Sequence, residues 1–233
     1  MLAAGIVEKN RFLASLPASA KTVLESRLTT HNGAIGDVLQ VADSEIDAVW
    51  FPLAGMVSSL RPLERGAMVE VDAAGIEGFL GIELALGATT TADTWMVQAA
   101  GRFARLETKY FLEALDREPG LRDRAMRYAW AALAVRGQWV ACNARHTIEQ
   151  RLAKWLLVAR DRVGEELQIT QDVIATMLGV RRASVVTVLG RFVDDGIVAH
   201  GYARLKVVDE ERLRGISCVC YQRSAELIAR SAP

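Results

Sequence analysis

The side chains best able to bind a metal or act as nucleophiles are few in this chain of 233 residues. They are the three cysteines Cys142, Cys218 and Cys220 and the three histidines His31, His146 and His200. Three thiols are too few and too unevenly spaced for a disulfide framework in a chain of this size. An iron–sulfur cluster held by thiolates alone needs four, and no cysteine precedes Cys142.

The Cys218-Val219-Cys220 pair has no two further ligands nearby in the sequence, so we interpret it as two small residues in a C-terminal helix. We expect His146 and His200 on the surfaces of a helix and a strand, and His31 alone cannot complete a metal site. The chain also lacks a Walker loop, a dinucleotide fingerprint, a Gly-x-Ser-x-Gly elbow and a His-Glu-x-x-His motif. The prediction is a protein without metal, cofactor or enzymatic activity.

A different chemistry is offered by two arginines, Arg181 and Arg182, which directly follow Leu178-Gly179-Val180. A guanidinium at the start of an exposed helix can donate two hydrogen bonds to the O6 and N7 atoms of guanine. We assign that role to Arg182. Arg181 is better placed for a phosphate, which sets orientation rather than sequence preference.

Two short helices joined by a turn would position these arginines. Thr170 can cap the first helix, with Gln171 in its first turn, and both are candidate phosphate contacts. Gly179 stands where a tight turn between helices requires glycine. The second helix is expected from Arg182 to Asp194, and Gly196 terminates it.

The second helix has two contrasting faces. Val185, Val188, Leu189 and Phe192 form an apolar face, whereas the opposite face carries small side chains. The candidate DNA-reading positions on this helix, besides Arg182, are Ala183, Ser184, Val186 and Thr187. A helix that enters a major groove needs little bulk and base-reading groups near its start, and Val186 and Thr187 can touch a thymine methyl group.

A β-hairpin is predicted after this helix, from Ile197 to Val208, with a turn at Gly201-Tyr202. Arg204 and Lys206 alternate with Leu205 and Val207, so both cations face one side. The hairpin therefore resembles the wing of a winged helix, with Arg204 and Lys206 toward the DNA backbone.

A long helix is expected upstream, beginning at Pro119 and reaching about residue 142. Its apolar positions follow the 4-3-4-3 spacing of a two-stranded coiled coil, and they are Met126, Trp130, Leu133, Gly137 and Val140. We predict that they form a homodimer interface. The alternative is that this seam packs on its own domain.

The N-terminal half has a different residue pattern. Nine of the 18 glycines lie between Gly33 and Gly101 and separate short runs rich in Val, Ile, Trp and Thr, which is typical of a β-barrel or sandwich. Residues 1–118 hold 10 Lys and Arg against 16 Asp and Glu, and residues 119–233 hold 18 against 12, so the second half is the one suited to a polyanion. No segment has the pattern of a membrane span or a signal peptide, which predicts a cytoplasmic location.

The run from Leu178 to Val185 resembles the turn and recognition helix of the Crp/Fnr family of bacterial transcription regulators, and the segments 48–58 and 75–81 resemble its jelly-roll sensor. The resemblance covers nearly the whole chain. It implies an α+β fold with a β-barrel sensor domain over 1–118, a dimerisation helix over 119–143 and a winged helix-turn-helix over 144–233. It also implies binding to two-fold symmetric double-stranded DNA and contact with RNA polymerase. Ala183 and Thr187 replace the family's best-known groove residues, so the operator should differ.

The same resemblance raises cyclic AMP as an effector. Such a site needs a Gly-Glu pair and an arginine about ten residues later, but Ile82 separates Gly81 from Glu83, and no Lys or Arg lies between Arg65 and Arg102. Asp93 adds negative charge there. We therefore predict that cyclic AMP does not bind. The residues left to line a pocket for an unknown effector are Gly81, Glu83, Thr89, Thr90 and Thr91.

Two alternatives remain open. One is a cyclic-nucleotide-responsive regulator with an atypical pocket, and the other is an interaction protein whose winged helix docks on another protein. Salt-dependent DNA binding separates the second from the leading hypothesis, since counterion release makes DNA affinity fall steeply with salt.

Overall fold

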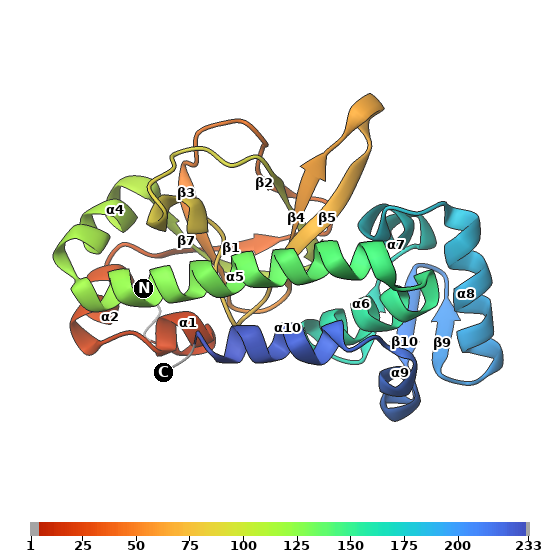
Figure 1. Ribbon diagram of the computed structural model, residues 1–233. Helices are drawn as coiled ribbons and strands as arrows, with labels where there is room; N and C mark the ends of the chain where they lie inside the picture. The colour runs from red at the N-terminus through yellow and green to blue at the C-terminus, as the bar shows by residue number, and fades with distance from the viewer. Residues whose placement is uncertain (1–4, 232–233) are drawn as a thin grey trace.

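A computed structural model of the protein describes residues 5–231 (Figure 1). The chain begins with short helical segments, which lie beside the barrel: the 3₁₀ turn Val7–Lys9, α1 (Arg11–Ala14) and α2 (Ala18–Glu25). Asn10 fixes this start to the barrel, because its side-chain amide donates hydrogen bonds to the carbonyls of Pro52 and Gly78. The fold class is α+β, as predicted.

The N-terminal half forms two antiparallel sheets. One has the order β1-β7-β3 and the other β2-β6-β4-β5. Their strands are β1 (Thr29–Gly33), β2 (Val38–Gln40), β3 (Ala48–Pro52), β4 (Met56–Pro62), β5 (Met68–Ala74), β6 (Thr94–Ala99) and β7 (Gly101–Glu107). A 3₁₀ turn, Glu64–Gly66, joins β4 to β5, and the short helix α3 (Ile82–Ala85) precedes β6. The expectation that this half consists of short β-strands is therefore confirmed.

The barrel core is filled by aromatic side chains that come from different elements. Phe51 on β3, Trp95 on β6 and Phe103 on β7 are at most 1% exposed. Phe12 and Phe79 pack near them with tilted rings, whose centroids are 4.5 Å apart. Burial of such large apolar surfaces is the main stabilisation of this half.

Two helices follow the barrel, and the sequence analysis predicted only the second. α4 spans Thr108–Arg117 and buries Phe111, Ala114 and Leu115 at helical spacing. The long helix α5 spans Pro119–Arg145, with Pro119 in its first turn. The prediction of a long helix that begins at Pro119 is therefore confirmed, whereas α4, which continues directly from the last barrel strand, was not predicted.

The winged helix follows α5. It consists of α6 (Ile148–Val163), β8 (Glu166–Gln168), α7 (Gln171–Leu178), α8 (Arg182–Asp194), β9 (Val198–Gly201), β10 (Arg204–Val207) and α9 (Glu210–Ile216). A capping box at Thr147 and Gln150 starts α6, and Gly164 ends it with a φ of 95°. The three strands form a small sheet in the order β8-β10-β9.

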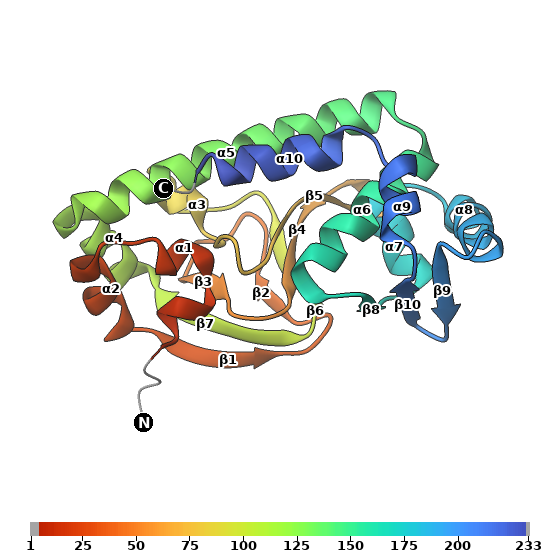
Figure 2. The same cartoon turned by 90° about the horizontal axis from the view of Figure 1, so that it is seen from below.

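The last helix, α10 (Cys220–Ala229), leaves the winged helix and runs back along α5 (Figure 2). Ile228 on α10 packs against both apolar cores, that of the barrel and that of the winged helix. The C-terminal helix thus connects the two halves.

Among residues 5–231 no single helix is long and apolar enough to cross a membrane. The helices α7 and α8 together have the required length and composition, but the chain bends by 113° between them.

Candidate functional site

The helix-turn-helix is built by local interactions that the sequence predicts. The Thr170 side chain accepts a hydrogen bond from the backbone N–H of Val173 and so caps α7. Gly179 ends α7 in the left-handed conformation, with a φ of 61°. A Cβ on Gly179 would also lie 3.1 Å from Val69 of the barrel, so the turn touches strand β5. Glycine is required there both for its backbone angle and for space.

Helix α8 has the two faces that its sequence predicts. Val185, Val188, Leu189 and Phe192 are buried. The positions that face solvent are Arg182, Ala183, Val186, Thr187 and Gly190, with Ser184 half-buried at the edge. Thr187 donates its hydroxyl to the carbonyl of Ala183, so its hydrogen-bond donor is already used within the helix.

The two arginines lie at the exposed start of α8. Arg181 is the N-cap residue and Arg182 the first helical residue, where the unpaired N–H groups of the helix favour an anion. Arg182 Nε lies 3.4 Å from Asp172 Oδ1, but both side chains are more than 60% exposed. An exposed ion pair of this kind contributes little, so Arg182 is free to exchange it for another acceptor.

The wing carries its two cations on one side. Arg204 and Lys206 are exposed, whereas Leu205 and Val207 are buried. Both cations lie near carboxylates at the start of the small sheet, Arg204 at 3.5 Å from Glu166 and Lys206 at 3.7 Å from Glu165. Tyr202, which the sequence analysis did not select, stands at the hairpin turn with its side chain fully exposed.

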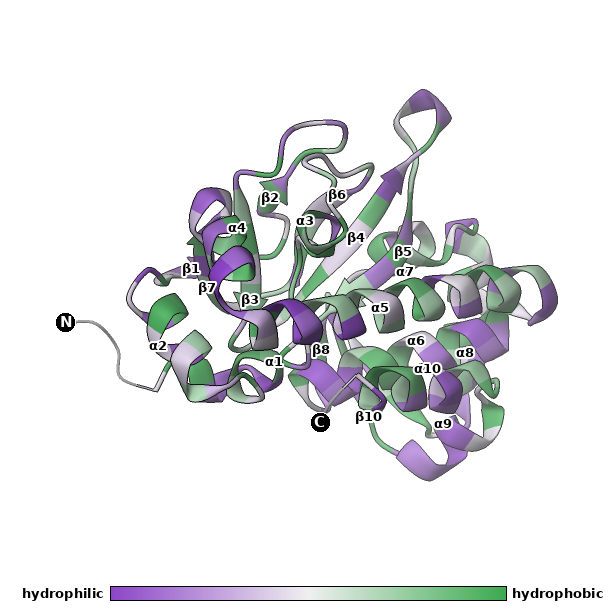
Figure 3. Ribbon diagram, turned by 60° about the vertical axis from the view of Figure 1, so that its left-hand side comes forward, coloured by the Kyte–Doolittle hydropathy of each residue, from purple (hydrophilic) through white to green (hydrophobic). Residues whose placement is uncertain are grey.

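The coiled-coil seam of α5 lies on the outside of the molecule. Met126, Trp130, Leu133 and Val140 are between 45% and 71% exposed, and Gly137 is exposed as well. The opposite side of α5 buries residues such as Tyr128, Val135 and Trp139. In Figure 3 hydrophobic and hydrophilic segments alternate along α5. The alternative that the seam packs on its own domain is therefore wrong.

The residues predicted to line an effector pocket do not all come together. Thr91 is buried and donates a hydrogen bond of 2.9 Å to Glu83 on α3, and Gly81 precedes that helix. Thr89 and Thr90 are exposed on the following loop and do not line the hollow beside Gly81 and Glu83. That hollow measures only about 10 Å³. It has room for about one water molecule, whereas small-molecule sites measure about 300 to 1,000 Å³.

Asp93 does not add free negative charge to this region, and that interpretation was wrong. Its carboxylate, 1% exposed, lies 2.5 Å from Arg61 Nε on β4 and 3.0 Å from Arg136 Nη1 on α5. Arg136 also contacts Asp72 at 3.3 Å. These arginines are distant in sequence from Asp93. The region therefore contains cations, but buried carboxylates hold them.

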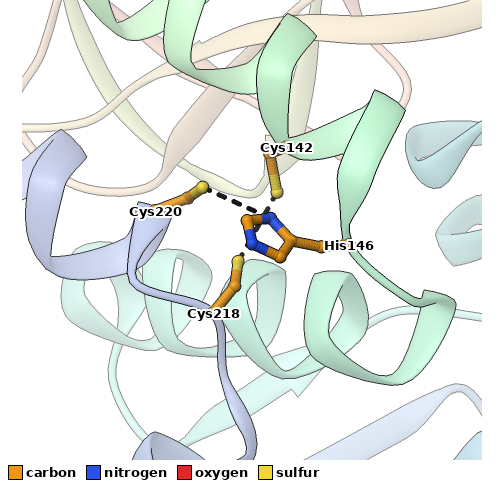
Figure 4. Close-up of side chains that lie close together, drawn as sticks. All are labelled: Cys142, His146, Cys218 and Cys220. Atoms are coloured by element: carbon orange, nitrogen blue, oxygen red, sulfur yellow. Dashed lines mark hydrogen bonds between the residues drawn. The ribbon is translucent and has the colours of Figure 1, made fainter.

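A cluster of side chains at the C-terminal end of α5 was not predicted from the sequence. Cys142, His146, Cys218 and Cys220 converge there, with one ligand atom from each within 4.8 Å of the others (Figure 4). The interpretation of Cys218 and Cys220 as two small residues in a C-terminal helix is wrong, because Cys218 precedes α10 and both lie beside Cys142 and His146 in space. His200 is exposed on β9, as predicted. The partners of the pair come from more than 70 residues away, which spacing within the sequence cannot reveal.

Comparison with known proteins agrees with this architecture. The Crp-like helix-turn-helix domain model matches residues 150–216, from α6 to the end of α9. The HTH-type transcriptional regulator Cmr of Mycobacterium tuberculosis is 24% identical over 200 residues, covering 83% of this chain and 78% of that protein. The structure of FixK2 from Bradyrhizobium japonicum superposes with a TM-score of 0.66 at 16% identity, over 82% of this chain and 98% of that one.

Residues 150–216 are thus a Crp-like helix-turn-helix domain, and the chain as a whole has the fold of Crp/Fnr-type transcription regulators. The likeness of fold does not specify an effector. The regulator CLP of Xanthomonas campestris, described as responsive to c-di-GMP, also superposes, with a TM-score of 0.63 at 13% identity over 82% of this chain and 99% of that one.

Proposed function

We propose that the protein is a sequence-specific regulator that binds two-fold symmetric double-stranded DNA as a homodimer. The observation that carries this proposal is the exposed face of α8: small side chains and Thr187, with Arg182 at its N-terminal end. A face of this kind fits a major groove, because backbone and side chains can approach the base edges closely.

The roles within this surface follow from position. Arg182 reads guanine through paired hydrogen bonds, and Val186 and Thr187 contact a thymine methyl group. Ala183 and Ser184 line the same face. The phosphate contacts are assigned to Thr170, Gln171 and Arg181 beside the turn and to Arg204 and Lys206 on the wing. The exposed ion pairs of Arg204 and Lys206 with carboxylates are weak enough for phosphates to replace the carboxylates.

Homodimerisation is assigned to the outer seam of α5, namely Met126, Trp130, Leu133, Gly137 and Val140. Large apolar side chains there are about half exposed or more, and a coiled-coil partner would remove them from water. Pairing through α5 places two recognition helices in one particle, which a two-fold operator requires. In this role the protein acts in the cytoplasm and contacts RNA polymerase.

The sensor half is assigned no cyclic-AMP binding. The hollow beside Gly81 and Glu83 is too small for a nucleotide, and Arg61 and Arg136 are engaged with Asp93. Calorimetry with cyclic AMP should give no heat of binding. A micromolar affinity would instead favour the alternative of an atypical cyclic-nucleotide pocket.

DNA binding is tested by filter binding across salt concentrations, with wild type and Arg182→Ala. We expect the logarithm of the binding constant to fall linearly with the logarithm of the salt concentration, with a slope of about −0.9 for each phosphate neutralised. Arg182→Ala should relax base preference at one position and weaken specific binding by about 1 to 3 kcal/mol. Arg105→Ala, on the barrel, is the control and should bind as wild type. If wild type showed no salt-dependent DNA binding, the winged helix would be a protein-docking module instead; unchanged specificity in Arg182→Ala would refute its assignment as the base reader.

A further inference from the structure

Four side chains able to bind a metal meet where α5 ends. Cys142 and His146 are one helical turn apart at the C-terminal end of α5, and Cys218 and Cys220 flank the start of α10. Cys142 Sγ lies 3.5 Å from Cys218 Sγ, and Cys220 Sγ lies 3.5 Å from His146 Nδ1. Figure 4 shows the three sulfurs arranged around the imidazole ring.

We propose that Cys142, His146, Cys218 and Cys220 bind one zinc ion in a tetrahedral site of three sulfurs and one nitrogen. With Zn–S bonds of about 2.3 Å and a Zn–N bond of about 2.0 Å, neighbouring ligand atoms lie about 3.5 to 3.8 Å apart. The distances of 3.5 Å from Cys142 Sγ to Cys218 Sγ and from Cys220 Sγ to His146 Nδ1 agree with that range. Three cysteines with one histidine are also a common ligand set of structural zinc sites.

The geometry favours one metal ion over a cluster of several. All four ligand atoms lie within 4.8 Å of one another. An iron–sulfur cluster would hold its cysteines on different irons and therefore further apart. The set of ligands is also complete, which is typical of a structural zinc site and unlike a catalytic one, where a position stays open for water.

The surroundings suit a site with negative charge. Zinc binding releases three protons from the thiols, and Zn²⁺ with three thiolates and a neutral imidazole carries one net negative charge. Lys154, only 3% exposed, and Arg151 lie on α6 close enough for electrostatic interaction with Cys142 and Cys218. Gln138 Nε2 donates a hydrogen bond of 3.1 Å to Cys220 Sγ, as an outer partner that orients a ligand does.

The proposed ion would close a loop that contains the whole DNA-binding unit. Cys142 and Cys218 are 76 residues apart, and the winged helix lies between them. His146 directly precedes Thr147, the N-cap of α6, so the metal would fix the junction between α5 and the winged helix. Arg151 also donates a hydrogen bond to the carbonyl of Leu178 at the end of α7, which links this region to the helix-turn-helix.

The first test uses the wild-type full chain, without DNA. Protein purified under reducing conditions should contain one zinc per chain by elemental analysis. After removal of the metal with a chelator, titration with Co²⁺ should saturate at one ion per chain and give the intense visible bands of tetrahedral cobalt with thiolate charge-transfer absorption. A thermal midpoint that rises when zinc is returned is also expected, because the ion binds only the folded site.

Single variants then assign the ligands. His146→Ala, Cys218→Ser and Cys220→Ser should each weaken Co²⁺ binding by at least about 100-fold. His200→Ala is the matched control, since this histidine is exposed on the wing, and it should bind cobalt as wild type does. The wild-type titration stands even where a variant fails to fold.

Several results would overturn the proposal. They are substoichiometric metal in the wild type, the weak spectrum of octahedral cobalt, the absorption of an iron–sulfur cluster, or a disulfide between Cys142 and Cys218 that persists in protein purified with a reductant. Metal content is measured apart from DNA binding, so the site and the proposed function fail or stand independently.

Discussion

The cations of the winged helix and those of the barrel are held in opposite ways. On the winged helix Arg182, Arg204 and Lys206 are exposed, and their contacts with carboxylates are 3.4 Å or longer. Against the barrel, Arg136 of α5 is largely buried and lies 3.0 Å from Asp93, a fully buried carboxylate. Exposed, loosely paired cations can exchange partners with a polyanion, whereas buried, paired ones stabilise the fold. A cation therefore indicates a binding site only where it is exposed and loosely paired, so that it can contact a ligand.

The largest effect is expected from removing the buried carboxylate of Asp93, which pairs with Arg61 and Arg136. Asp93→Ala leaves Arg61 and Arg136 without their shared carboxylate and should lower the free energy of unfolding by about 3 to 5 kcal/mol. Asp47→Ala is the control, because Asp47 is 67% exposed and pairs with Arg105 at 3.0 Å. It should change stability by about 0 to 1 kcal/mol. Equal losses in urea denaturation of the two variants would contradict the distinction drawn between buried and exposed pairs.

A second buried carboxyl lies between the barrel and the winged helix and gives a pH effect. Glu70 on β5 accepts hydrogen bonds from Ser58 and from Trp155 on α6, and burial raises its pKa to about 7, against the lowering influence of these bonds and of the charges on Lys154 and Arg162. A folded-state pKa above the unfolded value means that the folded protein holds a proton more firmly. This contribution to stability is full below the unfolded pKa of 4.5 and is lost as pH rises through 7.

Between pH 4.5 and pH 7 the ionisation of Glu70 should lower the free energy of unfolding by roughly 3 kcal/mol. Glu70→Gln cannot ionise, so its stability should lack this part of the pH dependence, measured by denaturation at pH 5 and pH 8. Glu113→Gln, on the exposed side of α4, is the control and should keep the wild-type profile. A Glu70→Gln profile identical to that of wild type would show that Glu70 is ionised in the folded protein throughout.

The smallest effect is expected on the wing. Lys206→Ala removes one phosphate contact and should weaken binding to all DNA sequences about equally, with the salt slope reduced by about 1. Lys109→Ala removes an exposed cation from α4 and should leave the slope unchanged. A slope that falls equally for both would mean that the whole surface charge, rather than the wing, attracts DNA.

How much the sequence predicts depends on how far apart the cooperating residues are. The Thr170 cap, the Gly179 turn and the buried Val185 and Phe192 depend on neighbours within one or two turns, and the structure has them all. Their helical spacing alone determines which side each residue faces. The exposed seam of α5 was predicted from spacing in the same way.

The features that were missed depend on distant partners. Asp93 is paired across 32 residues with Arg61 and across 43 with Arg136, and Cys142 meets Cys218 across 76. No local period relates such residues, because the barrel topology and the return of α10 along α5 bring them together (Figure 2). The same return means that the region 144–233, predicted as one DNA-binding domain, ends in a helix that packs on α5.

The central claim is that α8 reads DNA from within a two-fold dimer. Selection of bound sequences from random double-stranded DNA tests it directly, with the unmodified protein. We expect a palindromic motif whose half-sites are centred about 34 Å apart, with a guanine in each half that loses its enrichment in Arg182→Ala. An enriched motif without two-fold symmetry, or no enrichment at all, would contradict it.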